Sequence, residues 1–227
     1  MANRGFYLSR RHFPAKSMIT PMMKNQSTDP QALRAQIAAL AARLVAQDGA
    51  DYASAKRKAA RQLLGDAAVP GAMPDDRQVE DEVRQYHALF SGPSQPARIL
   101  QLRTLALQVM ELLAPFQPYL TGAVLSGSAG EHDDIQLQLF AESSKDVEIF
   151  LLNQNLNIEI SETPHFKGAR HDPVETVSFL WRREGVHAQV YERDDLRGAL
   201  KARPDGRLQR VDAAGLRLLM TNPESPT

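Results

Sequence analysis

Residues 119–140, YLTGAVLSGSAGEHDDIQLQLF, constrain the fold more than any other stretch of this chain. The apolar run Leu120–Leu125 is short and well bounded, which predicts a buried strand. A turn of small residues, SGSAG over 126–130, follows the run. Residues 134–139 then alternate between polar and apolar side chains, which predicts a second strand with one polar and one buried face. The stretch therefore predicts two strands joined by a glycine–serine turn.

The turn and the acid that follows it are the predicted ligand site. Backbone N–H groups in a tight turn attract anions, and carboxylates bind hard cations. We therefore expect Gly127 and Ser128 to bind a nucleotide phosphate, and Asp134 to bind a divalent metal, Mg²⁺ or Mn²⁺. A turn chosen only for its backbone geometry is the alternative for Gly127–Ser128.

At these residues the chain resembles the nucleotidyltransferase superfamily, whose fold is shared by polymerase beta-like enzymes. The family pattern is an apolar strand, Gly-Ser, a loop, and then Asp, an apolar residue and a second acid. Gly127–Ser128 and Asp134–Ile135 match this pattern, whereas Gln136 stands where the second acid is expected and the loop is shorter. The resemblance covers roughly residues 97–200. It implies an α+β fold, with a nucleotidyltransferase-like mixed sheet flanked by helices.

The same resemblance implies a catalytic set that this chain fills incompletely. Nucleotidyl transfer needs two divalent ions about 4 Å apart, bridged by carboxylates. Asp134 and Gln136 occupy the first two positions. The later strand VHAQVYE, where the family carries its third acid, offers His187 and Gln189 instead. Glu159 on the predicted strand LNIEI is therefore the candidate third acid.

Glycines, prolines and apolar spacing divide the chain into four parts. Residues 1–28 carry five basic residues and no acid, which predicts a disordered basic arm, a transit-peptide-like leader or a later translation start. Residues 29–92 predict an N-terminal helical segment, residues 93–220 the α/β domain, and residues 221–227 a tail. Within the domain, a hairpin is predicted with its turn at Glu184–Gly185.

A basic cluster on the second predicted helix is a further candidate for phosphate contacts. It comprises Lys56, Arg57, Lys58 and Arg61. Such a cluster binds phosphate in nucleic-acid-binding proteins, but four basic residues also make an ordinary solvated helix face. The whole chain gives no further support, because its 27 Lys and Arg residues balance its 27 Asp and Glu residues.

Composition and motifs narrow the class of protein. The chain has no cysteine, which excludes disulfides and thiolate metal sites and fits a reducing compartment. No apolar run approaches the roughly 20 residues that span a bilayer, so we expect a cytoplasmic protein without a membrane partner. The sequence contains no GxxxxGK[ST] and no HExxH, and Ser128 does not lie in a GxSxG motif.

Three functions fit these observations. The first is an active nucleotidyltransferase that moves a nucleoside monophosphate from a nucleoside triphosphate to an unknown acceptor, either RNA or protein. The second is a catalytically inactive member of the fold that binds a nucleotide or RNA. The third is a protein-interaction module in which the helical segment is the docking surface. The missing second acid favours the last two, and the retained turn and Asp134 favour the first two.

Overall fold

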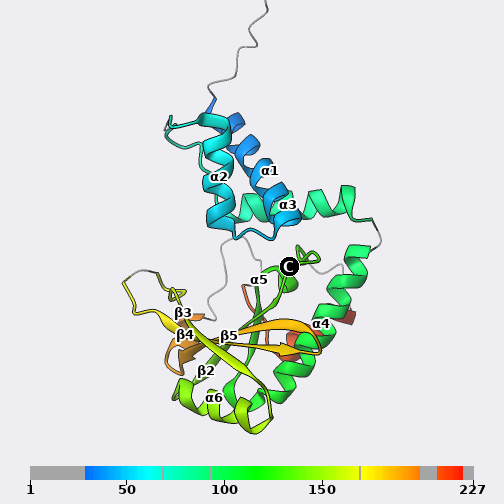
Figure 1. Ribbon diagram of the computed structural model, residues 1–227, viewed down its shortest axis with the longest axis vertical. Helices are drawn as coiled ribbons and strands as arrows, with labels where there is room; N and C mark the ends of the chain where they lie inside the picture. The colour runs from blue at the N-terminus through cyan, green and yellow to red at the C-terminus, as the bar shows by residue number, and fades with distance from the viewer. Residues whose placement is uncertain (1–28, 68, 93, 169, 200–208, 222–227) are drawn as a thin grey trace, which may run out of the picture.

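The structure, a computed structural model, covers most of the chain beyond the predicted arm. It describes residues 29–67, 69–92, 94–168, 170–199 and 209–221. The predicted arm over residues 1–28 and the tail after residue 221 lie outside the described residues. Figure 1 shows two lobes, a helical lobe built from α1, α2 and α3 and a sheet lobe that begins with α4.

Three helices form the helical lobe, and an aspartate immediately precedes and caps each of them. They are α1 (Pro30–Asp48), α2 (Tyr52–Leu64) and α3 (Asp76–Phe90). The side chains of Asp29, Asp51 and Asp75 accept hydrogen bonds from backbone N–H groups of the first turn. Such caps satisfy donors that a helix start leaves unpaired. The helices bury a common core around Ile37 and Val79.

The sheet lobe contains five strands and the remaining helices. Its elements are α4 (Ser94–Leu112), a 3-10 turn (Ala114–Phe116), β1 (Tyr119–Thr121), α5 (Gly122–Ser126), β2 (Ile135–Ala141), α6 (Ser144–Asn153), β3 (Ile158–Thr163), β4 (Val174–Trp181), β5 (Glu184–Glu192), α7 (Asp195–Ala199) and α8 (Ala213–Thr221). The protein is thus an α+β protein, with an N-terminal helical segment followed by a five-stranded mixed sheet. Over the described ranges, no helix is long and apolar enough to cross a membrane.

The strands run in the order β1-β2-β5-β4-β3. β2 and β5 are parallel, and the other neighbours are antiparallel. A two-residue bridge between Leu120 and Val211 lies at the β1 edge, with N–H···O distances of 2.8 and 3.0 Å. This bridge fixes the residues just before α8 beside β1.

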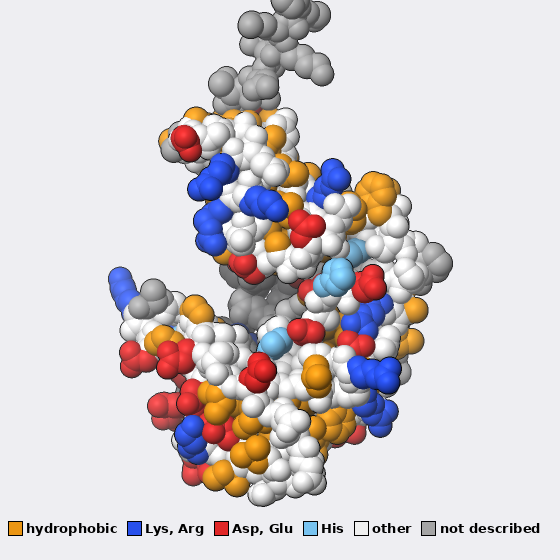
Figure 2. All heavy atoms as spheres, viewed as in Figure 1, with side chains coloured by type: hydrophobic (Ala, Val, Ile, Leu, Met, Phe, Trp, Pro, Cys, Tyr) orange, Lys and Arg blue, Asp and Glu red, His pale blue; other side chains and the backbone are white. Residues whose placement is uncertain are grey.

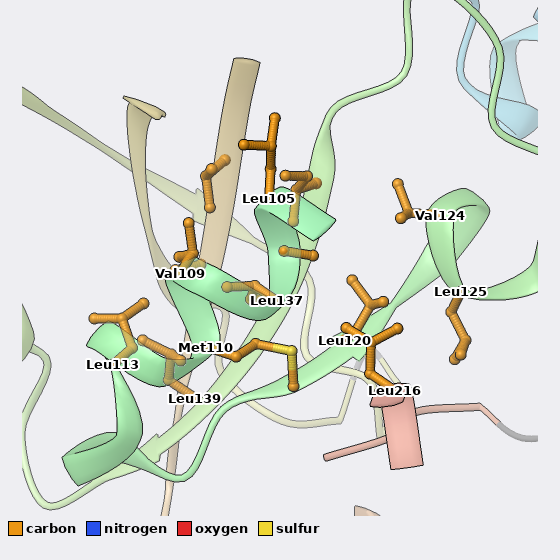
Figure 3. Close-up of a cluster of buried hydrophobic side chains, with 14 of the residues drawn as sticks. Leu105, Val109, Met110, Leu113, Leu120, Val124, Leu125, Leu137, Leu139 and Leu216 are labelled. Atoms are coloured by element: carbon orange, nitrogen blue, oxygen red, sulfur yellow. The ribbon is translucent and has the colours of Figure 1, made fainter. Parts of the chain in front are cut away.

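One face of the sheet is buried by helices. Ile135, Leu137 and Leu139 of β2 are fully buried, as their alternation in the sequence predicted. They pack with apolar side chains of α4, α6 and α8, such as Val109 and Leu216. Figure 3 shows these leucines and valines converging from the helices and strands on one core. Burial of this surface supplies the main stabilisation of the lobe.

Most of the other face of the sheet is polar, although Phe140 and Tyr191 at one end of it form a small buried aromatic cluster. Directly opposed residues point to the same side of a sheet, so the register places two rows of polar side chains across it. The first row is Thr121, Gln136, His187, Ser178 and Glu159; the second is Tyr119, Gln138, Gln189, Thr176 and Ser161. The sheet thus has an apolar face that holds the lobe together and a polar face that is available for a site.

The predicted strand over Leu120–Leu125 is wrong beyond its first two residues. β1 ends at Thr121, and Gly122 has a φ of +71°, which turns the chain into the short helix α5. Val124 and Leu125 are buried by that helix instead of by a strand. A short apolar run fits either structure, because burial on all sides removes the periodicity that separates strand from helix.

The predicted hairpin turn is also displaced. β4 and β5 are joined by Arg182 and Arg183, both with positive φ (51° and 76°), so the turn precedes Glu184–Gly185. Left-handed backbone costs a non-glycine residue roughly 1–2 kcal/mol. The two residues that looked like the turn are instead in β5. Glu184 holds Arg98 of α4 through two contacts of 2.5 and 2.7 Å.

Candidate functional site

A cavity of about 780 Å³ lies between the two lobes, and we call it the interlobe cavity. Figure 2 shows the hollow at this position, with acidic and histidine side chains at its rim. The helical lobe contributes residues of α1, α2 and α3, including Tyr52 and Arg84. The sheet lobe contributes residues of the β1–α5 turn, the start of β2, and the pair Phe166 and Arg210. The volume lies in the range of small-ligand sites.

The glycine–serine turn over residues 126–130 is a joint between the lobes, and its carbonyl oxygens are already bound. The side-chain amide of Gln95 donates to the carbonyls of Gly127 and Ala129, at 3.0 and 3.3 Å. Arg84 of α3 donates to the carbonyl of Ser126 at 3.5 Å. Two side chains from outside the sheet therefore hold this turn in place.

Further contacts seal the turn against the helical lobe. Ser128 is only 1% exposed, and its hydroxyl lies 3.0 Å from that of Ser126. Burial raises the pKa of Tyr52, which is close to Ser128, to about 12. The ring of His87 lies against Gly130, where an added Cβ would approach Cε1 to 2.8 Å. The turn is thus packed on both sides.

Gly127 and Ser128 therefore do not lie where the sequence placed them, at an open phosphate site. Gly127 caps α5, with its N–H bonded to the carbonyl of Ala123. Neither residue lines the interlobe cavity; Gly122 and Ala123, one helical turn earlier, line it instead. The displacement follows from the early end of β1, which moves the strand-to-helix turn upstream.

Asp134, the predicted metal ligand, is part of a hydrogen-bonded chain across the sheet. Its Oδ2 lies 3.0 Å from Nε2 of His187, and Nδ1 of that ring lies 2.8 Å from the hydroxyl of Ser178. A carboxylate only accepts, so Nε2 of the neutral imidazole carries the proton and Nδ1 accepts from Ser178. Asp134 lies on the ridge between the interlobe cavity and a second cavity.

Gly185 is the residue that makes room for this carboxylate. A Cβ at Gly185 would lie 2.4 Å from Oδ1 of Asp134, closer than any real contact allows. Its φ lies outside the left-handed region, so the backbone itself does not require glycine there. The glycine is therefore explained by the Asp134 carboxylate that lies against it.

The donors present do not fit a two-ion centre. The carboxylate of Asp134 is bonded to His187, and that of Asp133 accepts the N–H of Gly130 at 2.8 Å. Gln136 supplies a neutral oxygen where the predicted set needs a charge. Among the residues that the structure describes, no group of three histidine or acidic side chains could hold a metal ion.

Glu159 is separated from the other two predicted catalytic residues. It is exposed on β3, three strands from Gln136 on β2. Neighbouring strands are about 4.8 Å apart, so the separation is roughly 14 Å. Glu159 and Asp134 do share the second cavity. A pair of ions about 4 Å apart cannot be bridged across that distance.

Arg210 is a site residue that the sequence did not indicate. Its guanidinium lies 4.8 Å from the ring centroid of Phe166, and both residues line the interlobe cavity. Its Nε and Nη1 are buried, and neither has a hydrogen-bond partner among the residues that the structure describes. Burial lowers the pKa of Arg210. The bridge from Val211 to Leu120 places this arginine, and no local pattern in the sequence predicts such a bridge.

The carboxylates of the cavity, in contrast, are mostly engaged. Of the five acids in its lining, four have partners within the protein. Asp51 caps α2, Asp76 holds Lys56 at 2.7 Å, Asp133 closes its own loop and Asp134 binds His187. The fifth acid is Glu80, and Arg210 is the buried cation of the lining whose Nε and Nη1 have no partner among the residues that the structure describes.

The basic cluster of α2 lies apart from this cavity. Arg57, Lys58 and Arg61 are exposed, and Lys58 lies 3.8 Å from Asp48. Lys56 holds Asp76 through the contact already described. None of the four side chains lines the interlobe cavity. Any phosphate contact that they make would be at a separate surface.

Comparison with known proteins adds no family to this description. No protein-family model matches the chain, and no curated protein shows significant sequence similarity to it. The resemblance to nucleotidyltransferases therefore stays a prediction from the short motif.

Replacement of Gly185 by alanine tests whether the glycine makes room for the carboxylate of Asp134. We expect Gly185→Ala to lower the free energy of unfolding by about 1–3 kcal/mol, because the new methyl group overlaps the carboxylate. In an Asp134→Ala background the same change should cost less than about 0.5 kcal/mol. Urea unfolding of the four chains measures this coupling, and equal costs in both backgrounds would contradict the proposed contact.

His87 makes stability depend on pH. Burial lowers its pKa, so the unfolded chain takes up the proton first as the pH falls. The contribution is complete above the unfolded pKa of about 6.5 and is lost as the pH falls through that value. We expect the wild type to lose more stability between pH 7.5 and 5.5 than His87→Gln. Thermal unfolding of both proteins at the two pH values measures this difference, and equal losses of stability would contradict it.

Proposed function

We propose that this protein is a nucleotidyltransferase-like protein without transfer activity, which binds a nucleotide in the interlobe cavity without a divalent metal. The observation that carries the proposal is the guanidinium of Arg210. Among the residues that the structure describes, its buried Nε and Nη1 have no hydrogen-bond partner, and Arg210 is one of the residues that line the cavity. A phosphate group provides the negative charge and the acceptors that these donors need.

The cost of the unpaired cation supports an anionic ligand. A buried charged donor without an acceptor carries a desolvation penalty of a few kcal/mol. The Phe166 ring offsets part of it by a cation–π contact, but it accepts no hydrogen bond in the plane of the guanidinium. An anion that occupies the cavity beside Arg210 would remove the rest. Arg84 also lines this cavity, but its guanidinium is already paired with Asp81 and donates to the carbonyl of Ser126.

Neutral polar groups in the same cavity suit the remainder of a nucleotide. The amides of Gln136 and Gln209 both line it, and each offers one acceptor and two donors to a base or ribose. Tyr52 adds an aromatic surface from the helical lobe. The acids that would hold a metal ion are paired or absent. This supports binding without a metal, in which arginine contacts the phosphate directly.

The proposal retains the fold and the nucleotide of the sequence prediction and omits the metal and the transfer reaction. An RNA or protein partner and a cytoplasmic location stay predictions. If nucleotidyl transfer did occur, the carboxylate set would have to come from residues that lie about 14 Å apart. This separation supports a binding function over a catalytic one.

Calorimetry in buffer with EDTA tests the proposal with ATP, GTP, CTP and UTP. We expect one of these nucleotides to bind the wild type, and Arg210→Ala to weaken that binding by about 10- to 100-fold, because the charge-assisted hydrogen bonds are lost. Arg217→Ala is the matched control, since that arginine is exposed and pairs with Glu111 on α4. Its affinity should equal that of the wild type.

Two further outcomes decide between the readings. The matching nucleoside, which has no phosphate, should bind at least tenfold more weakly than the nucleotide. Binding that appears only after Mg²⁺ or Mn²⁺ is added, and is lost in Asp134→Ala, would overturn the proposal in favour of the metal-dependent enzyme. If none of the four nucleotides binds, with or without the metal, both the metal-free binding proposal and the metal-dependent enzyme are refuted.

A further inference from the structure

We propose a second chemical site on the sheet, in which Ser178 is a nucleophile toward carboxylic esters, His187 is its base and Asp134 orients that base. The three side chains form one continuous chain of hydrogen bonds, at 2.8 and 3.0 Å. They come from β4, β5 and the residue before β2, so the fold brings together groups far apart in the sequence. The inference does not depend on nucleotide binding.

The direction of the hydrogen bonds is the one that activates a serine. The carboxylate fixes the proton on Nε2 of His187, which leaves the lone pair of Nδ1 facing the Ser178 hydroxyl. A hydroxyl that donates to a neutral imidazole can transfer its proton there as it attacks. Asp134 then stabilises the imidazolium that forms.

Two features of the hairpin show that this arrangement is specified by the sequence. Gly185 leaves the space that the Asp134 carboxylate occupies. The turn that a glycine would ease is instead made by Arg182 and Arg183, both in left-handed backbone. Strained residues of this kind persist where the surrounding structure fixes them, often at functional sites. The glycine of this hairpin thus lies beside Asp134 and not in the turn, where it would relieve the left-handed backbone.

The site opens into a cavity of its own. Ser178, His187 and Asp134 all line a second cavity of about 670 Å³, which also includes residues before and along β3. Leu156 and Leu180 give it apolar walls that suit an acyl chain. Asn155 and Asn157 are also among the residues that line this space, and their side-chain amides could donate N–H groups to an oxyanion.

The reaction balances without a cofactor. Oγ of Ser178 attacks the ester carbonyl carbon and its proton passes to Nδ1 of His187, which gives a tetrahedral oxyanion. The oxyanion collapses, the bond to the alcohol oxygen breaks, and Nδ1 returns the proton to the departing alcohol. Water then adds to the acyl-serine in the same way. Its proton passes through His187 back to Ser178, and a carboxylic acid is released.

A fluorophosphonate probe on the full-length protein tests this site. It phosphonylates only an activated serine, so intact mass and peptide mapping should show one adduct, at Ser178. We expect the adduct to be absent from Ser178→Ala and from His187→Ala, and hydrolysis of p-nitrophenyl acetate to fall at least 100-fold in both. Ser161→Ala is the matched control, because Ser161 lies on the same sheet face without a histidine neighbour in its row.

Asp134→Asn separates orientation from binding. It should slow the first-order rate of phosphonylation at least tenfold and leave the reversible affinity for the probe unchanged. Circular dichroism and urea unfolding confirm that each variant is folded. Absence of an adduct at Ser178 in the folded wild type, or hydrolysis that survives Ser178→Ala, overturns the proposal. Arg217→Ala, which changes an exposed side chain that lines neither cavity, should label at the wild-type rate.

Discussion

The parallel pairing of β2 with β5 is the constraint on which the rest of the structure depends. Its register sets Gln136 opposite His187 and Gln138 opposite Gln189, with all four side chains on one face. A slip of one residue would turn these groups into the core and expose the leucines of β2. Because the apolar face is held by α4, α6 and α8, that register is strongly fixed. The polar face is consequently rigid, and both proposed sites are built on it.

Local patterns predicted the elements well where periodicity and caps agreed. The alternation over residues 134–139 predicted β2 and its buried face, and residues 29–92 were correctly predicted as a helical segment. The apolar run before the turn was ambiguous, since full burial leaves no period to read. Gly185 was misleading, because its role is set by a carboxylate about 50 positions away in the chain.

The candidate site could be predicted only in part, because contacts between distant segments of the chain place its residues. Asp134 does lie at a cavity, and His187 had been noted as the residue standing where an acid was expected. Ser128 looked like a phosphate ligand but is sealed under the helical lobe by Tyr52. Arg210 has no signal in the sequence, since one bridge outside the strands proper brings it to the cavity. Contacts between distant segments decide each of these outcomes.

Charge explains how the two proposed sites coexist beside one aspartate. In the sheet, the amides of Gln136 and Gln189 occupy positions where carboxylates would bind metal ions. The remaining carboxylate, that of Asp134, is bonded to His187. Arg210 is a buried cation whose Nε and Nη1 lack partners among the described residues. On these grounds we propose an anion as the ligand of the interlobe cavity and a neutral ester as that of the second cavity. Asp134, on the ridge between them, belongs structurally to both.

Hydrogen–deuterium exchange of the full-length protein, with and without ATP and the other nucleoside triphosphates in EDTA, tests the central claim most directly. The account predicts that a bound nucleotide slows exchange in residues 164–168 and 209–212, which carry Phe166 and Arg210 at the cavity wall. Exchange in residues 126–130 should change little, because that turn is already sealed between the lobes. Protection confined to residues 126–130, or protection that requires a divalent metal, would contradict the account.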